Sequence, residues 1–199
     1  MTDARGLVVG DDGLTRCAWG ASTPDYTTYH DIEWGRAVHG ESALYERFTL
    51  EAFQSGLSWL TILRKREAFR AAFAQFDADV VARYGARERR RLMADTGIVR
   101  NGAKIDAAIT NAGAVLRLRE SGGLDHLVWS HAPTRRRRAP RSFADVVATT
   151  PESIALSKAL KRNGFVFVGP TTAYAAMQAC GLVNDHLAGC HARSAAGSA

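Results

Sequence analysis

The apolar residues of this chain recur with the period of an α-helix almost from one end to the other, and this spacing restricts its fold more than any other feature. Between residues 41 and 56, Leu44, Phe48 and Ala52 follow one another at steps of four, as on the buried face of an amphipathic helix. The only run that looks like a strand, residues 165–168, is too short and too isolated to build a sheet. The sequence therefore predicts an all-α fold.

Further helices are predicted where similar spacing lies between turn residues. Ser58 and Asp77 can each cap the helix that follows them, because a short polar side chain satisfies the free amides of a first turn. The predicted helices after the first cover residues 58–76, 77–84, 87–95, 103–120, 152–163 and 171–180. An exposed loop is expected around the arginine run 135–138, read as a linker.

Size and composition predict one domain of 15–190 between flexible tails at 1–14 and 191–199. The chain has 199 residues, of which 46% are hydrophobic, and no apolar stretch is long enough to span a bilayer. Because no secretory signal is visible either, we expect a cytoplasmic protein without a membrane partner. Lysine and arginine total 26 against 20 acids, a net charge of +6 that is compatible with a nucleic-acid partner, although arginine enrichment also follows from genomic base composition.

The cysteines and histidines near the two ends predict a metal site. His186 and Cys190 are four residues apart, as on one face of a helical turn, and Cys17 and His30 are separated by a loop-like stretch of twelve residues. Together they would supply two sulfur and two nitrogen ligands to a tetrahedral zinc ion, leaving no open position for catalysis. The alternative is a scatter of unligated side chains. Cys180, in an apolar segment, is interpreted as a core thiol.

One acid among aromatic residues predicts a binding pocket. Glu51 lies among apolar and small residues near the end of the first predicted helix, and Trp59 follows eight positions later. The other aromatic residues that could join them are Trp19, Tyr26, Tyr29 and Trp34. Stacking rings and one carboxylate are what a pocket for an extruded base requires. Alternatively, the rings belong to the core and the carboxylate faces solvent.

A helix, a glycine-containing turn and a second helix are predicted over residues 87–119. The turn amides and the start of the second helix could hold a DNA phosphate, with Arg100 and Lys104 nearby. A plain connection between two core helices is equally compatible with this spacing.

Together these segments resemble the bacterial 3-methyladenine DNA glycosylase I family. The resemblance includes LEAFQSGLSW at residues 50–59 and runs through almost the whole chain from Arg16 to Cys190. The remaining segments that carry it are residues 16–19, 29–35, 156–165, 167–172 and 177–186. The turn around Gly102 and the loop 131–150 depart from the pattern associated with the family.

The resemblance implies a helix-hairpin-helix fold of two helical lobes, with one structural zinc ion joining the N- and C-terminal segments. Its zinc ligands would be Cys17, His30, His186 and Cys190. The duplex backbone would be held by the hairpin at 97–102, and the backbone-contacting residues would be Gly97, Arg100, Gly102 and Lys104.

The resemblance also implies the activity and the roles in the pocket. The enzyme would flip 3-methyladenine out of alkylated double-stranded DNA and hydrolyse its glycosidic bond, leaving an abasic site without a lyase step and releasing the free base. Glu51 would be the catalytic residue, hydrogen-bonded to the base. Tyr29 would assist recognition, Trp59 would stack on the base, and Trp19, Tyr26 and Trp34 would complete the wall. The protein is expected to be a monomer.

Two other interpretations stay open from the sequence. A non-catalytic, zinc-stabilised helical module would bind duplex DNA through the same arginines but would need no carboxylate facing an aromatic slot. An enzyme of the same kind could also act on other lesions, such as 3-methylguanine, because pocket shape decides that range.

Overall fold

The computed structural model describes residues 2–135 and 137–196, and this part of the chain is mostly helical. Its helices are α1 (Pro24–Ile32), α2 (Glu41–Gln54), α3 (Trp59–Ala72), α4 (Ala78–Val81), α5 (Ala86–Ala94), α6 (Gly102–Leu118), α7 (Gly123–Trp129), α8 (Pro151–Arg162) and α9 (Pro170–Ala179). Short 3₁₀ turns are η1 (Ala18–Ala21), η2 (Ala74–Phe76), η3 (Arg119–Ser121), η4 (Phe143–Asp145) and η5 (His191–Ser194). No helix in the described ranges is long and apolar enough to cross a membrane.

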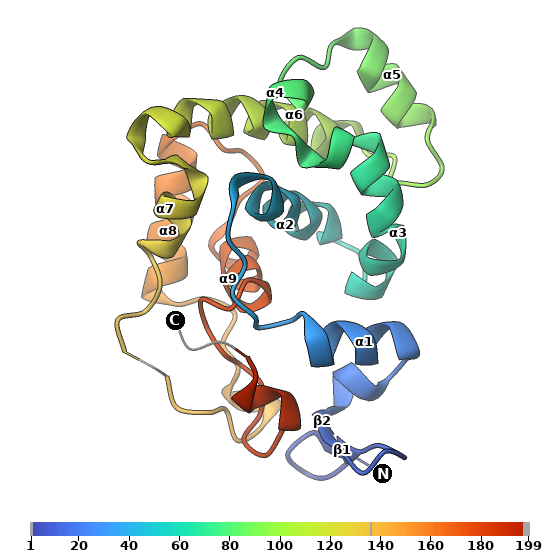
Figure 1. Ribbon diagram of the computed structural model, residues 1–199, viewed down its shortest axis with the longest axis vertical. Coiled ribbons are helices and arrows are strands. Elements are labelled where there is room, and N and C mark those ends of the chain that lie inside the picture. Colours follow the sequence, from blue (N-terminus) through green and yellow to red (C-terminus); the bar gives the residue numbers. More distant parts are fainter. Residues whose placement is uncertain (1, 136, 197–199) are drawn as a thin grey trace.

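Helix α2 forms the centre of the molecule. All of its residues from Leu44 to Phe53 are buried, and it packs against α3, α6, α7 and α9 (Figure 1). A helix buried on all sides must satisfy every polar side chain that it carries, so each charged residue of α2 needs a partner or a function.

Several helices begin where the sequence predicted. The Ser58 hydroxyl accepts a hydrogen bond from the Thr61 amide at the start of α3, and the Asp77 carboxylate caps α4 in the same way. The last long helix begins one residue earlier than predicted. Pro170 occupies its first turn and Gly169 precedes it, so Thr171 and Thr172 lie inside the helix and do not cap it.

The N-terminal segment is not the flexible tail predicted for residues 1–14. Strand β1 (Leu7–Val9) pairs antiparallel with β2 (Thr15–Cys17), and Leu7 lies opposite Cys17. Leu7 is buried in a small cluster with Leu187 and Cys190. Three residues are too few to show a recognisable alternating pattern, so strand β1 was not predicted. The strand is stabilised by its contact with the far end of the chain.

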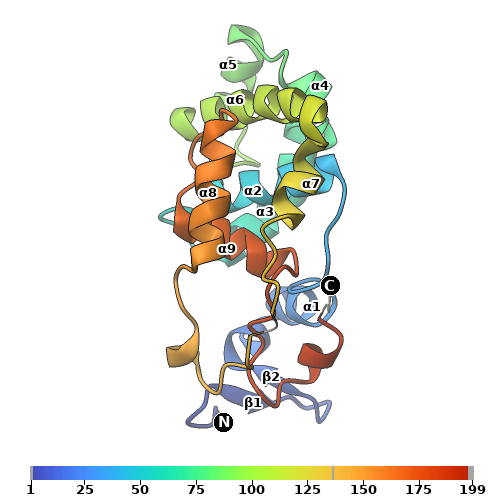
Figure 2. The same ribbon diagram turned by 90° about the vertical axis from the view of Figure 1, so that its left-hand side faces the viewer.

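The C-terminal segment is also more ordered than predicted. Turn η5 contacts β2 and α1 at one end of the molecule (Figure 2). The Asn184 side chain donates hydrogen bonds to the carbonyls of Arg193 and Ala196, and Ala196 is buried. Of the tail predicted at 191–199, residues 197–199 lie outside the described residues, as does residue 136 of the arginine run.

Residues 165–168, which looked like a strand, form an irregular connection between α8 and α9. The Asn111 side chain pairs with both backbone groups of Val166, at 2.8 and 3.1 Å, in place of a neighbouring strand. Phe167 follows with a positive φ of 56°, which a β-strand does not allow.

Candidate active site and metal centre

A cavity of about 250 Å³ opens where α1, α2, α3 and α9 meet. It is lined by Trp19, Tyr26, Tyr29, Trp34, Glu51, Gln54, Trp59, Ala175 and Gln178. The fold thus brings together the acid and the five aromatic residues that the sequence singled out, although η1, α1, the turn after α1, α2 and α3 supply them separately. Because these aromatic residues line a cavity, the alternative that they are only core residues does not account for their arrangement.

The aromatic wall is organised around Trp19. Its ring meets those of Tyr26 and Trp34 edge-on, with centroids 5.6 and 5.0 Å apart. The Tyr29 ring is also close to Trp19, at 6.4 Å, and it lies 5.4 Å from the ring of Trp59 with a tilt of 42°. The indole nitrogen of Trp59 is buried without a hydrogen-bond partner in the described structure. Flat rings and an unpaired donor suit a planar heterocyclic ligand.

Glu51 is the acidic group of the cavity. It is 7% exposed, and its carboxyl has no hydrogen-bond partner in the described part of the chain. Burial raises the pKa of Glu51 to about 8, although the positive charge of Arg47 opposes the shift. A carboxyl in this setting is costly to the fold unless it serves a ligand, and such groups concentrate at functional sites.

Two glutamines of the cavity were missed by the sequence analysis. Gln54 follows Glu51 by three residues on α2, and Gln178 lies on α9. The Gln178 amide donates to Asp185 at 2.8 Å, and Tyr174 donates to the same carboxylate at 2.5 Å. A carboxylate can only accept hydrogen bonds, so the NH₂ group of Gln178 must face Asp185. This orientation leaves the side-chain carbonyl oxygen of Gln178 free. A lone glutamine in the alanine-rich helix α9 was the available signal.

The loop residue Arg137 is connected to the same network. Its guanidinium donates to the Tyr174 hydroxyl at 2.6 Å. The described part of the arginine run is therefore not only a solvated linker.

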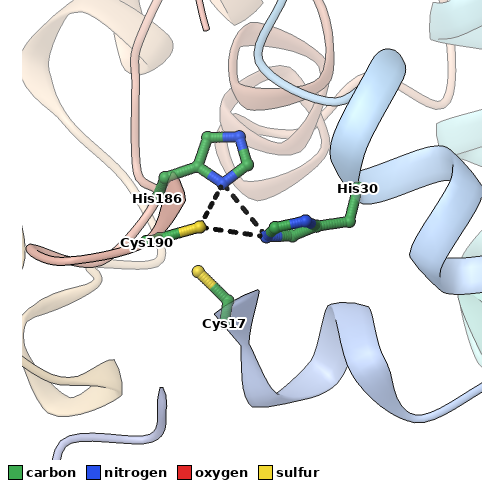
Figure 3. A group of neighbouring side chains, drawn as sticks. All are labelled: Cys17, His30, His186 and Cys190. Atoms are coloured by element: carbon green, nitrogen blue, oxygen red, sulfur yellow. Dashed lines mark hydrogen bonds between the residues drawn. The ribbon is translucent and has the colours of Figure 1, made fainter. Parts of the chain in front are cut away.

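The four predicted metal ligands lie together and are buried, with their ligand atoms all within 4.8 Å of one another (Figure 3). His186 Nδ1 is 3.2 Å from His30 Nε2, and Cys190 Sγ is 3.4 Å from His30 Nε2 and 3.6 Å from His186 Nδ1. Cys17 Sγ faces this group and accepts a hydrogen bond from the Leu187 amide. This group could hold a metal ion.

The outward nitrogen of each imidazole has its own acceptor. His30 Nδ1 lies 2.7 Å from the Asp31 carboxylate, and His186 Nε2 lies 3.2 Å from the Trp34 carbonyl. Such contacts fix the ring tautomer and present the other nitrogen to a metal. The neighbouring Cys17 thiol, and after it the two imidazoles, hold the pKa of Cys190 well below the usual range of a thiol, against the effect of burial.

The local structure of these ligands differs from the prediction. His186 and Cys190 lie on an irregular segment that ends in a turn, not on a helical turn. The stretch between Cys17 and His30 is not a loop, because it contains η1 and most of α1. The ligands meet because β1, β2 and the segment 184–190 pack together, which spacing alone cannot show.

The predicted backbone-binding residues lie between α5 and α6, but one of them is engaged elsewhere. Gly97 and Arg100 belong to the connecting turn, Arg100 is exposed, and Gly102 begins α6. Lys104 is buried, and its ammonium donates to the carbonyls of Phe53 and Ser55 at 2.9 and 2.6 Å. The Lys104 ammonium therefore anchors the end of α2.

Comparisons with known proteins agree with this arrangement. A family model described as methyladenine glycosylase matches residues 19–194. The DNA-3-methyladenine glycosylase 1 of Escherichia coli (strain K12) is 45% identical over 181 residues, covering 89% of this chain and 96% of the relative. The DNA-3-methyladenine glycosylase of Haemophilus influenzae is 43% identical, covering 88% and 96%. A structure on 3-methyladenine recognition by 3-methyladenine DNA glycosylase I from Staphylococcus aureus superposes with a TM-score of 0.85, at 34% identity, covering 89% of this chain and 96% of that one.

Proposed function

The chain belongs to the methyladenine glycosylase family, and on this basis we propose that it is a DNA-3-methyladenine glycosylase that removes 3-methyladenine from alkylated DNA by base excision. The membership confirms the family resemblance found in the sequence. The observation that carries the proposal is the cavity in which a buried carboxyl, Glu51, faces a wall of aromatic rings. A module that only binds duplex DNA has no use for such a cavity.

The chemistry of the lesion explains why the cavity needs so few reactive groups. A 3-methyladenine nucleotide carries positive charge on its base, so the glycosidic bond is already weakened. Once the base is flipped out of the stack, water adds to C1′ and loses a proton to solvent. The electrons of the C1′–N9 bond pass to the base, which leaves neutral. The enzyme mainly has to extrude and orient the base.

We assign the roles in the cavity by the chemistry of each side chain. Glu51 accepts a hydrogen bond from the alkylated adenine and interacts with its positive charge. Trp59 stacks on the ring, Tyr29 assists recognition, and the wall around Trp19 holds the opposite face. No residue described as lining the cavity is a lysine. This supports a monofunctional reaction, without a covalent amine intermediate, that leaves an abasic site.

The buried cysteine and histidine group suits one structural zinc ion. Ligands at about 2.0 Å for nitrogen and about 2.3 Å for sulfur lie about 3.3 to 3.8 Å apart in a tetrahedron. The three contacts among His30, His186 and Cys190, at 3.2 to 3.6 Å, are close to these values. A bound zinc would join the two ends of the chain, and with four protein ligands it would take no part in the reaction.

The turn between α5 and α6 is the proposed contact with the duplex backbone. The turn backbone at Gly97 and the start of α6 at Gly102 can approach phosphates closely, and the exposed Arg100 adds charge. This proposal makes α5, the turn and α6 the hairpin of a helix-hairpin-helix fold. We also propose that the enzyme acts in the cytoplasm, as a monomer.

The test is release of free base from DNA treated with a methylating agent, with 3-methyladenine resolved from 7-methylguanine and 3-methylguanine. Folded, metal-replete protein should release 3-methyladenine selectively, and Glu51→Ala should lose most of this activity while binding undamaged duplex as the parent does. Glu67→Gln, at a side chain 81% exposed, is the matched control. If the folded parent releases no base yet binds DNA, the protein is a binding module instead.

A further inference from the structure

A buried cluster of charged side chains lies behind Glu51. Arg47 is on α2, one turn before Glu51, and its side chain is only 9% exposed. Its Nη2 lies 2.6 Å from the carboxylate of Glu33, which directly follows α1. Arg66 of α3 binds both oxygens of the same carboxylate. Two guanidinium groups therefore share one carboxylate.

The charges of this cluster do not cancel. Arg47 and Arg66 carry two positive charges and Glu33 one negative charge, so one positive charge is left in a largely buried place. Consistent with this excess, Arg47 Nη1 is buried and has no hydrogen-bond partner in the described structure. A buried cation with an unused donor strongly favours a negative charge nearby.

Glu51 is placed to supply that negative charge. Residues four apart on a helix lie on the same face, with Cβ atoms about 5 to 6 Å apart. Glu51 lines the cavity whereas Arg47 does not. Arg47 can therefore influence the space for the base only through Glu51, and with Glu51 ionised the charges of Arg47, Arg66, Glu33 and Glu51 sum to zero.

We propose that Arg47 is a positioning residue that promotes the ionisation of Glu51, so that the cavity can present a carboxylate to a positively charged base. This inference rests on the proposed function. Arg47 itself does not contact the base. It acts through Glu51, because an opposite charge at this range offsets part of the cost of burying the carboxylate.

The other groups around Glu51 do not take over this role. Burial raises the pKa of Tyr29 and of Cys180, so both are neutral at ordinary pH. From α6, the Lys104 ammonium is bound to two carbonyls at the end of α2. Arg66 is tied to Glu33 from α3. Arg47 is the charged group that lowers the pKa of Glu51 against the effect of burial.

The experiment follows single-turnover release of 3-methyladenine across pH. The parent rate should rise with pH as Glu51 ionises. In Arg47→Met the midpoint of this pH dependence should move up by about one to three pH units. The rate of base release should then fall tenfold or more near neutrality and recover at high pH. Arg47→Lys should return the midpoint toward that of the parent. Glu33→Gln should move it down, because a second positive charge is then uncompensated.

The matched control is Arg70→Met, which also removes an arginine paired with a glutamate of α2, Glu46. It should keep the parent midpoint. If Arg47→Met lowers the rate equally at every pH, Arg47 is only structural and the inference is overturned.

A second measurement separates failure of the inference from failure of the proposed function. The difference in thermal stability between parent and Glu51→Gln follows the ionisation of Glu51 without any substrate. The pH at which this stability difference is half developed should also move up when Arg47→Met is introduced into both proteins. A parent that releases no base would contradict the proposed function, and this second midpoint would still decide whether Arg47 acts on Glu51.

Discussion

Replacing Glu51 by glutamine should stabilise the protein, and increasingly so as the pH rises. The pKa of Glu51 is raised from 4.5 to about 8 by burial. Between these values the folded state keeps a proton that the unfolded state has lost, so the parent loses stability as the pH increases. The whole shift corresponds to about 5 kcal/mol, at about 1.4 kcal/mol for each pKa unit.

Glu51→Gln keeps the size and polarity of the side chain but cannot ionise. From about pH 5 to about pH 8, the stability of the variant relative to the parent should therefore rise by about 3 to 4 kcal/mol. For a chain of this size this is a difference in Tm on the order of 10 °C. The pH dependence of the other groups, including the metal ligands, is common to both proteins and cancels in the difference.

The assay is thermal unfolding of both proteins at closely spaced pH values, followed by circular dichroism at fixed metal and salt concentrations. Glu67→Gln, with a side chain 81% exposed, is the control. Its stability relative to the parent should not change over this pH range. A constant difference in Tm between Glu51→Gln and the parent would mean that Glu51 ionises normally, and would refute the argument that its carboxyl is held at a cost to the fold.

Three further predictions concern the metal group, the DNA contact and the cavity wall. Cys190→Ser should contain less than one zinc per chain by metal analysis and melt on the order of 10 °C lower, because it loses a constraint between the chain ends; Cys180→Ala, outside the group, should retain zinc. Arg100→Ala should reduce by about one the slope of log K for duplex binding against log salt concentration. Lys104→Met should leave this slope unchanged and lower the free energy of unfolding by about 2 to 4 kcal/mol. Gln178 lines the cavity with a free carbonyl oxygen, and we expect this oxygen to accept a hydrogen bond from the base. Gln178→Ala should therefore reduce base release about tenfold with little change in Tm; an unchanged rate would mean that Gln178 does not bind the base.

The helices and their caps could be predicted because their signals are local. The four-residue spacing of Leu44, Phe48 and Ala52 and the caps at Ser58 and Asp77 depend only on near neighbours. The same holds for the composition of the cavity. A carboxylate among apolar and small residues and a tryptophan shortly after it are unusual enough to be recognised before any packing is known.

The contacts that were not predicted join residues far apart in the sequence. Lys104 looks like a DNA contact from its place near a glycine turn, but its ammonium reaches carbonyls 49 and 51 residues earlier in the chain. The pairing of Arg47 with Glu33 and the strand formed by Leu7 to Val9 also depend on tertiary packing. In each case the residue type was visible, and its partner was not.

The proposed zinc site and the cavity share the segment of residues 17–34, and this predicts how removal of a bound metal would affect function. Tyr29 lines the cavity while the next residue, His30, belongs to the metal group. The Trp34 carbonyl accepts from His186 while its ring lines the cavity, and the Trp19 ring lies 5.1 Å from that of His30. Glu51 and Trp59, in contrast, are held by α2 and α3. Metal removal should therefore loosen the aromatic wall and lower stability while the carboxyl and the stacking ring stay in place, so selectivity for the base should suffer before the bond-breaking step does.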